Sequence, residues 1–118
     1  MFEFKINNRN WTIEEKPQSE IKKIQNTRKA NQEENIYSTD VRYFGVTWFD
    51  EQTIYLDESL PAETKRAALI HELTHCYIGN YITHCDKQYT EEDIADIVSN
   101  SYDIITEIIS KYFKKEWG

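Results

Sequence analysis

The order in which hydrophobic patterns follow one another constrains the fold of this chain most strongly. Residues 2–13 alternate apolar with polar side chains around an asparagine-rich turn, and residues 41–49 and 53–57 are dense in β-branched and aromatic residues. The first segment predicts a short strand or a hairpin, and the other two together predict a β-hairpin. From Ala62 onward the chain contains no proline, and it predicts a helix over 62–78 and a second over 90–113. Strands followed by helices are typical of an α+β domain.

A single domain accounts for all 118 residues. The chain has no internal repeat and no linker rich in proline, glycine or serine. A domain of this length buries roughly two-thirds of its unfolded surface, so it needs neither a disulfide nor a metal to fold. A further amphipathic helix is expected over residues 18–30, between the first segment and the later hairpin. We therefore expect one domain spanning residues 1–118.

Charge and hydropathy exclude several classes of protein. The chain has 14 basic and 21 acidic residues, a net charge of −7, and nucleic-acid binding depends on Lys and Arg that neutralise phosphates, so direct nucleic-acid binding is not expected. The longest apolar run, residues 67–70, is too short to cross a membrane. The first residues lack the apolar core of a secretory signal. With only two cysteines, Cys76 and Cys85, reduced thiols and a cytoplasmic location are expected.

The first long helix contains the segment His71-Glu72-Leu73-Thr74-His75. Positions i and i+4 lie about 40° apart around a helix, so both imidazoles can reach one zinc ion at about 2.1 Å. Glu72 points to the neighbouring side, where it can act as a general base without ligating the metal. Such a segment arises by chance in roughly one of a hundred shuffled sequences of this composition. The competing interpretation is a solvent-facing histidine pair on an ordinary core helix.

A catalytic zinc ion of this kind needs a third protein ligand and one open position. We favour Glu92, with Asp96 four residues later able to orient a ligand imidazole. Taking Ile94 as the centre of the apolar stripe, Glu92 lies about 160° around the axis, yet Ala95 and Ser99 on its side would let two helices approach. The competing interpretation is that the acidic first turn complements the helix dipole. The other candidates for the third ligand are His84, Cys85, Asp86, Glu91, Asp93 and Asp96.

The His71–His75 motif in an uncharged helix, followed by Glu92-Asp93-Ile94-Ala95-Asp96, resembles the zincin metallopeptidases of the gluzincin type. More narrowly, residues 43–113 resemble the short ImmA/IrrE-like proteins of phages and bacterial mobile elements. The resemblance implies a minimal zincin-like domain, with a small antiparallel sheet packed on the active-site helix and a long C-terminal helix. It also implies Zn²⁺ as cofactor, His71, His75 and Glu92 as its ligands, and Glu72 as the catalytic base.

The expected function is zinc-dependent hydrolysis of a peptide bond in a protein or peptide substrate, and the resemblance suggests a regulatory protein such as a repressor. Zinc would lower the pKa of its water, and Glu72 would take the proton. Residues 54–56 are expected to form an edge strand that pairs with extended substrate. The alternative is a catalytically silent zinc-binding module that acts as an inhibitor or interaction partner. The candidate donors to the oxyanion are Tyr77, Tyr81, His84 and Tyr102.

Overall fold

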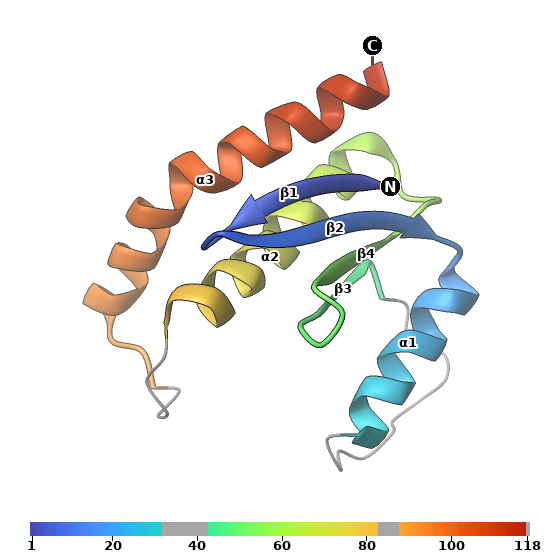
Figure 1. Cartoon of the computed structure of the whole chain (residues 1–118), viewed down its shortest axis with the longest axis horizontal. Helices are drawn as coiled ribbons and strands as arrows, with labels where there is room; N and C mark the ends of the chain where they lie inside the picture. Colours follow the sequence, from blue (N-terminus) through green and yellow to red (C-terminus); the bar gives the residue numbers. More distant parts are fainter. Residues whose placement is uncertain (32–42, 83–87, 118) are drawn as a thin grey trace.

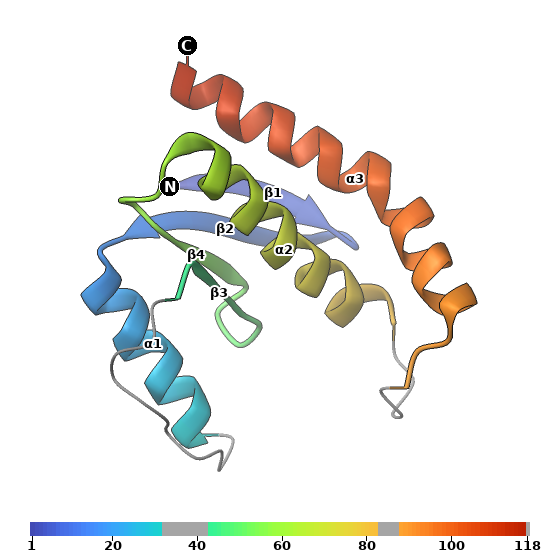
Figure 2. The ribbon, with the colours of Figure 1, turned by 180° about the vertical axis from the view of Figure 1, so that it is seen from behind.

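The computed structural model describes residues 1–31, 43–82 and 88–117 and confirms an α+β fold (Figure 1). Four strands form one sheet, two helices pack together on one side of the strands, and a third helix packs separately (Figures 1 and 2). The elements in chain order are β1 (Phe2–Ile6), β2 (Arg9–Lys16), α1 (Gln18–Asn31), β3 (Gly45–Trp48), β4 (Thr53–Asp57), α2 (Ala62–Tyr81) and α3 (Glu91–Trp117). Among the described residues, no helix is both long and apolar enough to cross a membrane.

The sheet is mixed, which corrects the prediction of an antiparallel sheet. Its strand order is β1-β2-β4-β3, with antiparallel pairs at both ends and a parallel pair, β2 and β4, in the centre. Parallel neighbours need a long crossover connection, and here that connection includes α1. Alternating hydrophobicity is the same for parallel and antiparallel pairs, so the strand pattern alone could not distinguish them.

The N-terminal segment forms a hairpin, and its turn is tied to the far end of α2. Asn7 and Asn8 both have positive φ, 48° and 61°, as a two-residue hairpin turn requires, and asparagine tolerates this conformation. The Asn7 backbone N–H donates to the Tyr81 hydroxyl at 2.8 Å, and its side-chain amide donates to the Asn80 carbonyl at 2.8 Å. Arg9 donates to the Asn80 side chain at 3.1 Å. These contacts fix the C-terminal end of α2 against the sheet.

The two faces of the sheet carry separate hydrophobic clusters. Ile54 and Leu56 of β4 belong to the main core with α2 and α3, whereas Tyr55 packs with Ile21 of α1 and Val46 of β3. All five residues of β4 are buried. The expectation that residues 54–56 form an edge strand is therefore wrong, because β4 lies between β2 and β3. The strand at that edge of the sheet is β3.

Helix α3 begins as its sequence predicts. The Thr90 hydroxyl accepts a hydrogen bond from the Asp93 backbone N–H at 3.1 Å, and the Asp93 carboxylate accepts one from the Thr90 N–H at 3.0 Å. This reciprocal pair is a capping box, and it satisfies two backbone donors at the helix start. The buried stripe of α3 consists of Ile97, Ser101, Ile105, Ile108, Ile109 and Tyr112.

The sequence places Ile94 at the centre of the apolar stripe of α3, but this residue is 53 % exposed. Val98, one turn later, is 60 % exposed, so Ile97 alone joins the main core from the first two turns of α3. Helix α2 is also longer than predicted, since it continues through Gly79 to Tyr81. Its extra turn packs against the sheet through Phe49, whose ring lies where a Cβ at position 79 would be.

Candidate metal centre

The two motif histidines lie side by side on the exposed face of α2. Their Nε2 atoms are 3.2 Å apart, and the ring centroids are 4.8 Å apart at an interplanar angle of 73°. Two nitrogens that bind one tetrahedral zinc ion at 2.0–2.1 Å stand about 3.3–3.4 Å from each other. The observed spacing of His71 and His75 therefore fits two corners of such a site, and the rings converge although the His71 side chain is 69 % exposed.

Glu72 is buried between α2 and the edge strand β3, next to the histidine pair. Its Oε1 accepts a hydrogen bond from the Thr47 hydroxyl at 2.8 Å, and the same hydroxyl lies 3.0 Å from the Glu72 backbone carbonyl oxygen. Its Oε2 is 4.0 Å from Nε2 of His71. Gly45 packs directly against this side chain, since a Cβ there would be 3.0 Å from Cγ of Glu72. The expected geometry, a carboxylate beside the first histidine, is present.

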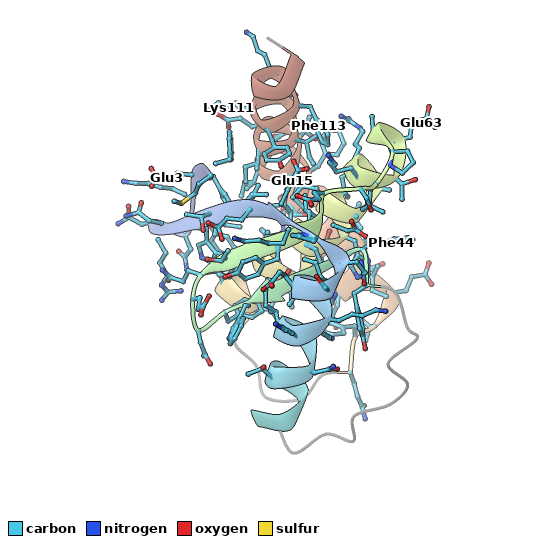
Figure 3. All side chains as sticks on the ribbon, turned by 90° about the vertical axis from the view of Figure 1, so that its right-hand side faces the viewer. Glu3, Glu15, Phe44, Glu63, Lys111 and Phe113 are labelled. Carbon is cyan, nitrogen blue, oxygen red and sulfur yellow. The ribbon has the colours of Figure 1, made fainter. Side chains whose placement is uncertain are left out.

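Two open hollows lie beside β3, and this carboxylate lines both of them. One, of about 390 Å³, has a mostly apolar wall that includes Phe44, which is nearly half exposed (Figure 3), together with Ala67 and Ala68. The other, of about 250 Å³, is lined by both histidines, Glu72, Gln25 of α1 and residues of β3. Tyr43, Gly45, His71 and Glu72 line both hollows.

Sequence reasoning missed the residues that β3 and α1 contribute to this site. Gly45 and Thr47 of β3, Tyr43 just before that strand and Gln25 of α1 carry no motif. The packing of β3 on α2 and of α1 on β3 brings them to the histidines. One local signal existed, because Gly45 and Thr47 are two residues apart and therefore share a face of their strand. The pattern did not reveal that this face meets Glu72.

Among the described residues, no third ligand lies with the histidine pair. In residues 1–31, 43–82 and 88–117, no group of three or more His, Cys, Asp or Glu side chains could hold a metal ion. Glu91 and Glu92 are exposed on the first turn of α3, Asp96 is exposed on the second turn, and Asp93 caps the helix. The role of Glu92 as third ligand stays a prediction. The candidates His84, Cys85 and Asp86 lie outside the described residues.

The tyrosines that were candidate donors to an oxyanion line neither hollow. Tyr77 is buried in the main core, and Tyr81 accepts the hydrogen bond from the N-terminal hairpin. Tyr102 is 64 % exposed on α3. Cys76, one residue after the motif, also faces the core, where burial raises the pKa of its thiol to about 12. This thiol stays protonated at neutral pH, and it lies in the core rather than with the exposed histidines.

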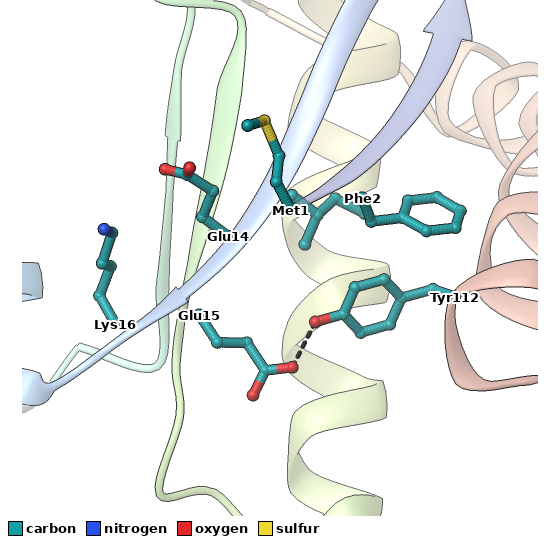
Figure 4. Close-up of a pocket in the computed structure, with 7 residues that line it drawn as sticks. Met1, Phe2, Glu14, Glu15, Lys16 and Tyr112 are labelled. Atoms are coloured by element: carbon teal, nitrogen blue, oxygen red, sulfur yellow. Dashed lines mark hydrogen bonds between the residues drawn. The ribbon is translucent and has the colours of Figure 1, made fainter. Parts of the chain in front are cut away.

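A separate hollow of about 460 Å³ lies at the other end of α2, beside the chain's N-terminus (Figure 4). Tyr112 reaches from α3 and donates its hydroxyl hydrogen bond to Glu15 of β2, as Figure 4 shows. The other oxygen of Glu15 pairs with Nζ of Lys65 on α2 at 2.7 Å. This partly buried group joins β2, α2 and α3, which indicates a structural role.

Comparisons of the chain with protein-family models, with curated proteins and with solved structures found no match. The functional argument therefore rests on the geometry of α2 and β3. That geometry provides two converging imidazole nitrogens, a buried carboxylate next to them and two open hollows that the carboxylate lines.

Proposed function

We propose that this chain is a zinc-dependent metallopeptidase that hydrolyses a peptide bond of a protein or peptide substrate. The observation that carries the proposal is the 3.2 Å separation of the His71 and His75 Nε2 atoms, with Oε2 of Glu72 4.0 Å from the first of them. Two nitrogen donors at tetrahedral spacing and an adjacent carboxylate are the parts that zinc-assisted hydrolysis needs on one helix.

The roles of the residues follow from their chemistry. A bound zinc ion supplies Lewis acidity, which acidifies water and polarises a carbonyl group. His71 and His75 would hold the ion through neutral Nε2 atoms, with Glu92 as the proposed third ligand. Glu72 would take a proton from the attacking water on Oε2 and deliver it to the leaving amine. The proposed substrate is an extended segment that pairs with the edge strand β3, beside the histidines.

Metal analysis of purified variants tests the proposal. We expect one zinc ion per chain, lost in His75→Ala and weakened in Glu92→Gln. Glu72→Gln is expected to keep the zinc ion and to lose cleavage. Glu107→Gln is the matched control, because Glu107 is an exposed carboxylate paired with Lys111 on α3. A chain that takes up no zinc, or a Glu72→Gln variant that cleaves as wild type does, would contradict the proposal.

The second candidate is a catalytically silent zinc-binding module that inhibits or binds another protein. It is favoured by the small size of the two hollows, about 390 and 250 Å³, which offer little wall to hold a long substrate. The same Glu72→Gln variant separates the two candidates. A silent module would keep its cellular function in this variant, whereas a peptidase would lose it.

A further inference from the structure

The hydroxyl of Thr47 lies 2.8 Å from Oε1 of Glu72 and 3.0 Å from the backbone carbonyl oxygen of the same residue. We propose that Thr47 is a positioning residue, which holds Oε1 of Glu72 so that Oε2 faces the histidine pair. The inference rests on the proposed peptidase function and names a residue of β3 that this function needs.

Thr47 is itself held rigidly. It is 4 % exposed, and its backbone lies in β3 opposite Ile54 of β4. A β-branched side chain in a strand has few χ1 rotamers, so its hydroxyl keeps one direction. The hydroxyl has a single proton, and both acceptors within reach belong to Glu72. Whichever of the two accepts, the hydrogen bond is made to the same residue.

Glu72 would otherwise be free to move, since a glutamate has three side-chain torsions. Gly45 lies two residues before Thr47 on the same face of β3 and contacts the middle of the glutamate side chain, because a Cβ there would be 3.0 Å from Cγ. Thr47 then fixes the end of the side chain. Gly45 and Thr47 together hold the Glu72 carboxylate in one position.

The two carboxylate oxygens consequently have different tasks. Oε1 is occupied by the Thr47 hydroxyl at 2.8 Å, and Oε2 lies 4.0 Å from Nε2 of His71. A general base must present its free oxygen within hydrogen-bond reach of the proton that it takes. The Thr47 contact occupies Oε1, so Oε2 is the free oxygen, and it faces the histidine pair.

The test uses zinc-loaded full-length protein and acetohydroxamate, which chelates zinc and gives a proton to a neighbouring carboxylate. Its dissociation constant, measured by calorimetry, reports whether Glu72 is aimed at the metal without requiring a known substrate. We expect Thr47→Val to weaken binding roughly tenfold, the value of a hydrogen bond to a charged group. Thr47→Ser keeps the hydroxyl and is expected to bind within about threefold of wild type. Thr47→Ala replaces the valine variant if that protein does not fold.

Two controls separate positioning from general structural damage. Thr53→Val removes another buried threonine hydroxyl, 3.0 Å from that of Thr12 in the same sheet, and is expected to leave hydroxamate binding unchanged. In a Glu72→Gln background, Thr47→Val is expected to cause no further loss. Zinc content and the thermal unfolding midpoint are measured for every variant.

Each other outcome overturns the inference. If Thr47→Val binds hydroxamate as wild type does, or Thr47→Ser is as weak as Thr47→Val, the hydroxyl does not position Glu72. If Thr47→Val weakens binding equally in the Glu72→Gln background, its role is structural. In these cases the metallopeptidase proposal still stands. If wild type takes up no zinc, the two proposals fail together.

Discussion

Gly45 packs so closely that a single methyl group there tests how rigid the candidate site is. In Gly45→Ala, the new Cβ would lie 3.0 Å from the Tyr55 carbonyl oxygen, 3.0 Å from Cγ of Glu72 and 3.1 Å from Cδ2 of Leu56. The carbonyl belongs to the sheet and Leu56 is fully buried, so neither can move aside. Overpacking of this kind costs about 1–3 kcal/mol, and the stiffer unfolded chain offsets about 0.4–1 kcal/mol. We expect a net loss of about 1–2 kcal/mol.

Gly79 provides the comparison, because its overlap is larger but its neighbour can move. A Cβ at this position would lie 2.2 Å from Cε1 of Phe49, yet that ring is 42 % exposed and can rotate towards solvent. The rotation loses the edge contact between Phe49 and Trp11, worth about 0.5–1.5 kcal/mol. Alanine in place of glycine within a helix gains up to about 1 kcal/mol. We expect Gly79→Ala to stay within about 1 kcal/mol of wild type.

The measurement is urea unfolding followed by circular dichroism, with tryptophan fluorescence reporting on Trp11. The free energy of unfolding should be lower for Gly45→Ala than for Gly79→Ala, although the added Cβ would come closer to its nearest neighbour at position 79. Zinc uptake should be unchanged in Gly45→Ala, because the histidines are not touched. The reasoning is refuted if Gly45→Ala is as stable as wild type, or if Gly79→Ala is the more damaging of the two.

Three further predictions concern the fold. Tyr112→Phe removes the hydroxyl that donates to Glu15 and should lower the free energy of unfolding by about 1 kcal/mol, measured by urea unfolding; no change would exclude a stabilising role for this contact. Thr90→Ala removes the cap of α3 and should cost about 1 kcal/mol by the same measurement, with Thr90→Ser close to wild type. Burial raises the pKa of the Cys76 thiol from 9.0 to about 12, so the folded protein keeps a proton that the unfolded chain loses. Stability should therefore fall as the pH rises above about 9, by at most about 1.4 kcal/mol per pH unit, and Cys76→Ala should show a smaller fall between pH 8 and pH 10.

Features that depend on residues close in sequence could be predicted. The capping box of α3 needs only Thr90 and Asp93, three residues apart, and the hairpin turn needs only Asn7 and Asn8. The convergence of the motif histidines is equally local, since four residues of helix bring two side chains to one side. In each case a single element sets the geometry, so the spacing of residue types is sufficient.

The arrangement of the strands could not be predicted in the same way. All five residues of β4 are buried, including the polar Thr53 and Asp57, so its sequence does not alternate apolar with polar side chains. Its position in the centre of the sheet depends on β2, where the residue paired with Thr53 is Thr12, 41 residues earlier. The contact of Thr47 with Glu72 follows from that position, because β3 becomes the edge strand over α2 only after β4 pairs with β2. Long-range pairing decides which strand forms the wall of the site.

The third metal ligand shows why helix arithmetic has a limit. The same rotation of 100° per residue that brings His71 and His75 together places Glu92 about 160° from Ile94, whose side of α3 continues into the buried stripe. Glu92 is accordingly exposed, on the opposite side of its helix from the residues that pack against the core. The hydrophobic stripe determines which face of α3 is buried. That orientation in turn determines which carboxylates of α3 can reach a metal ion on α2. Glu92 lies opposite this stripe. It can therefore bind the metal only if the first turn of α3 lies along the face of α2 that carries His71 and His75.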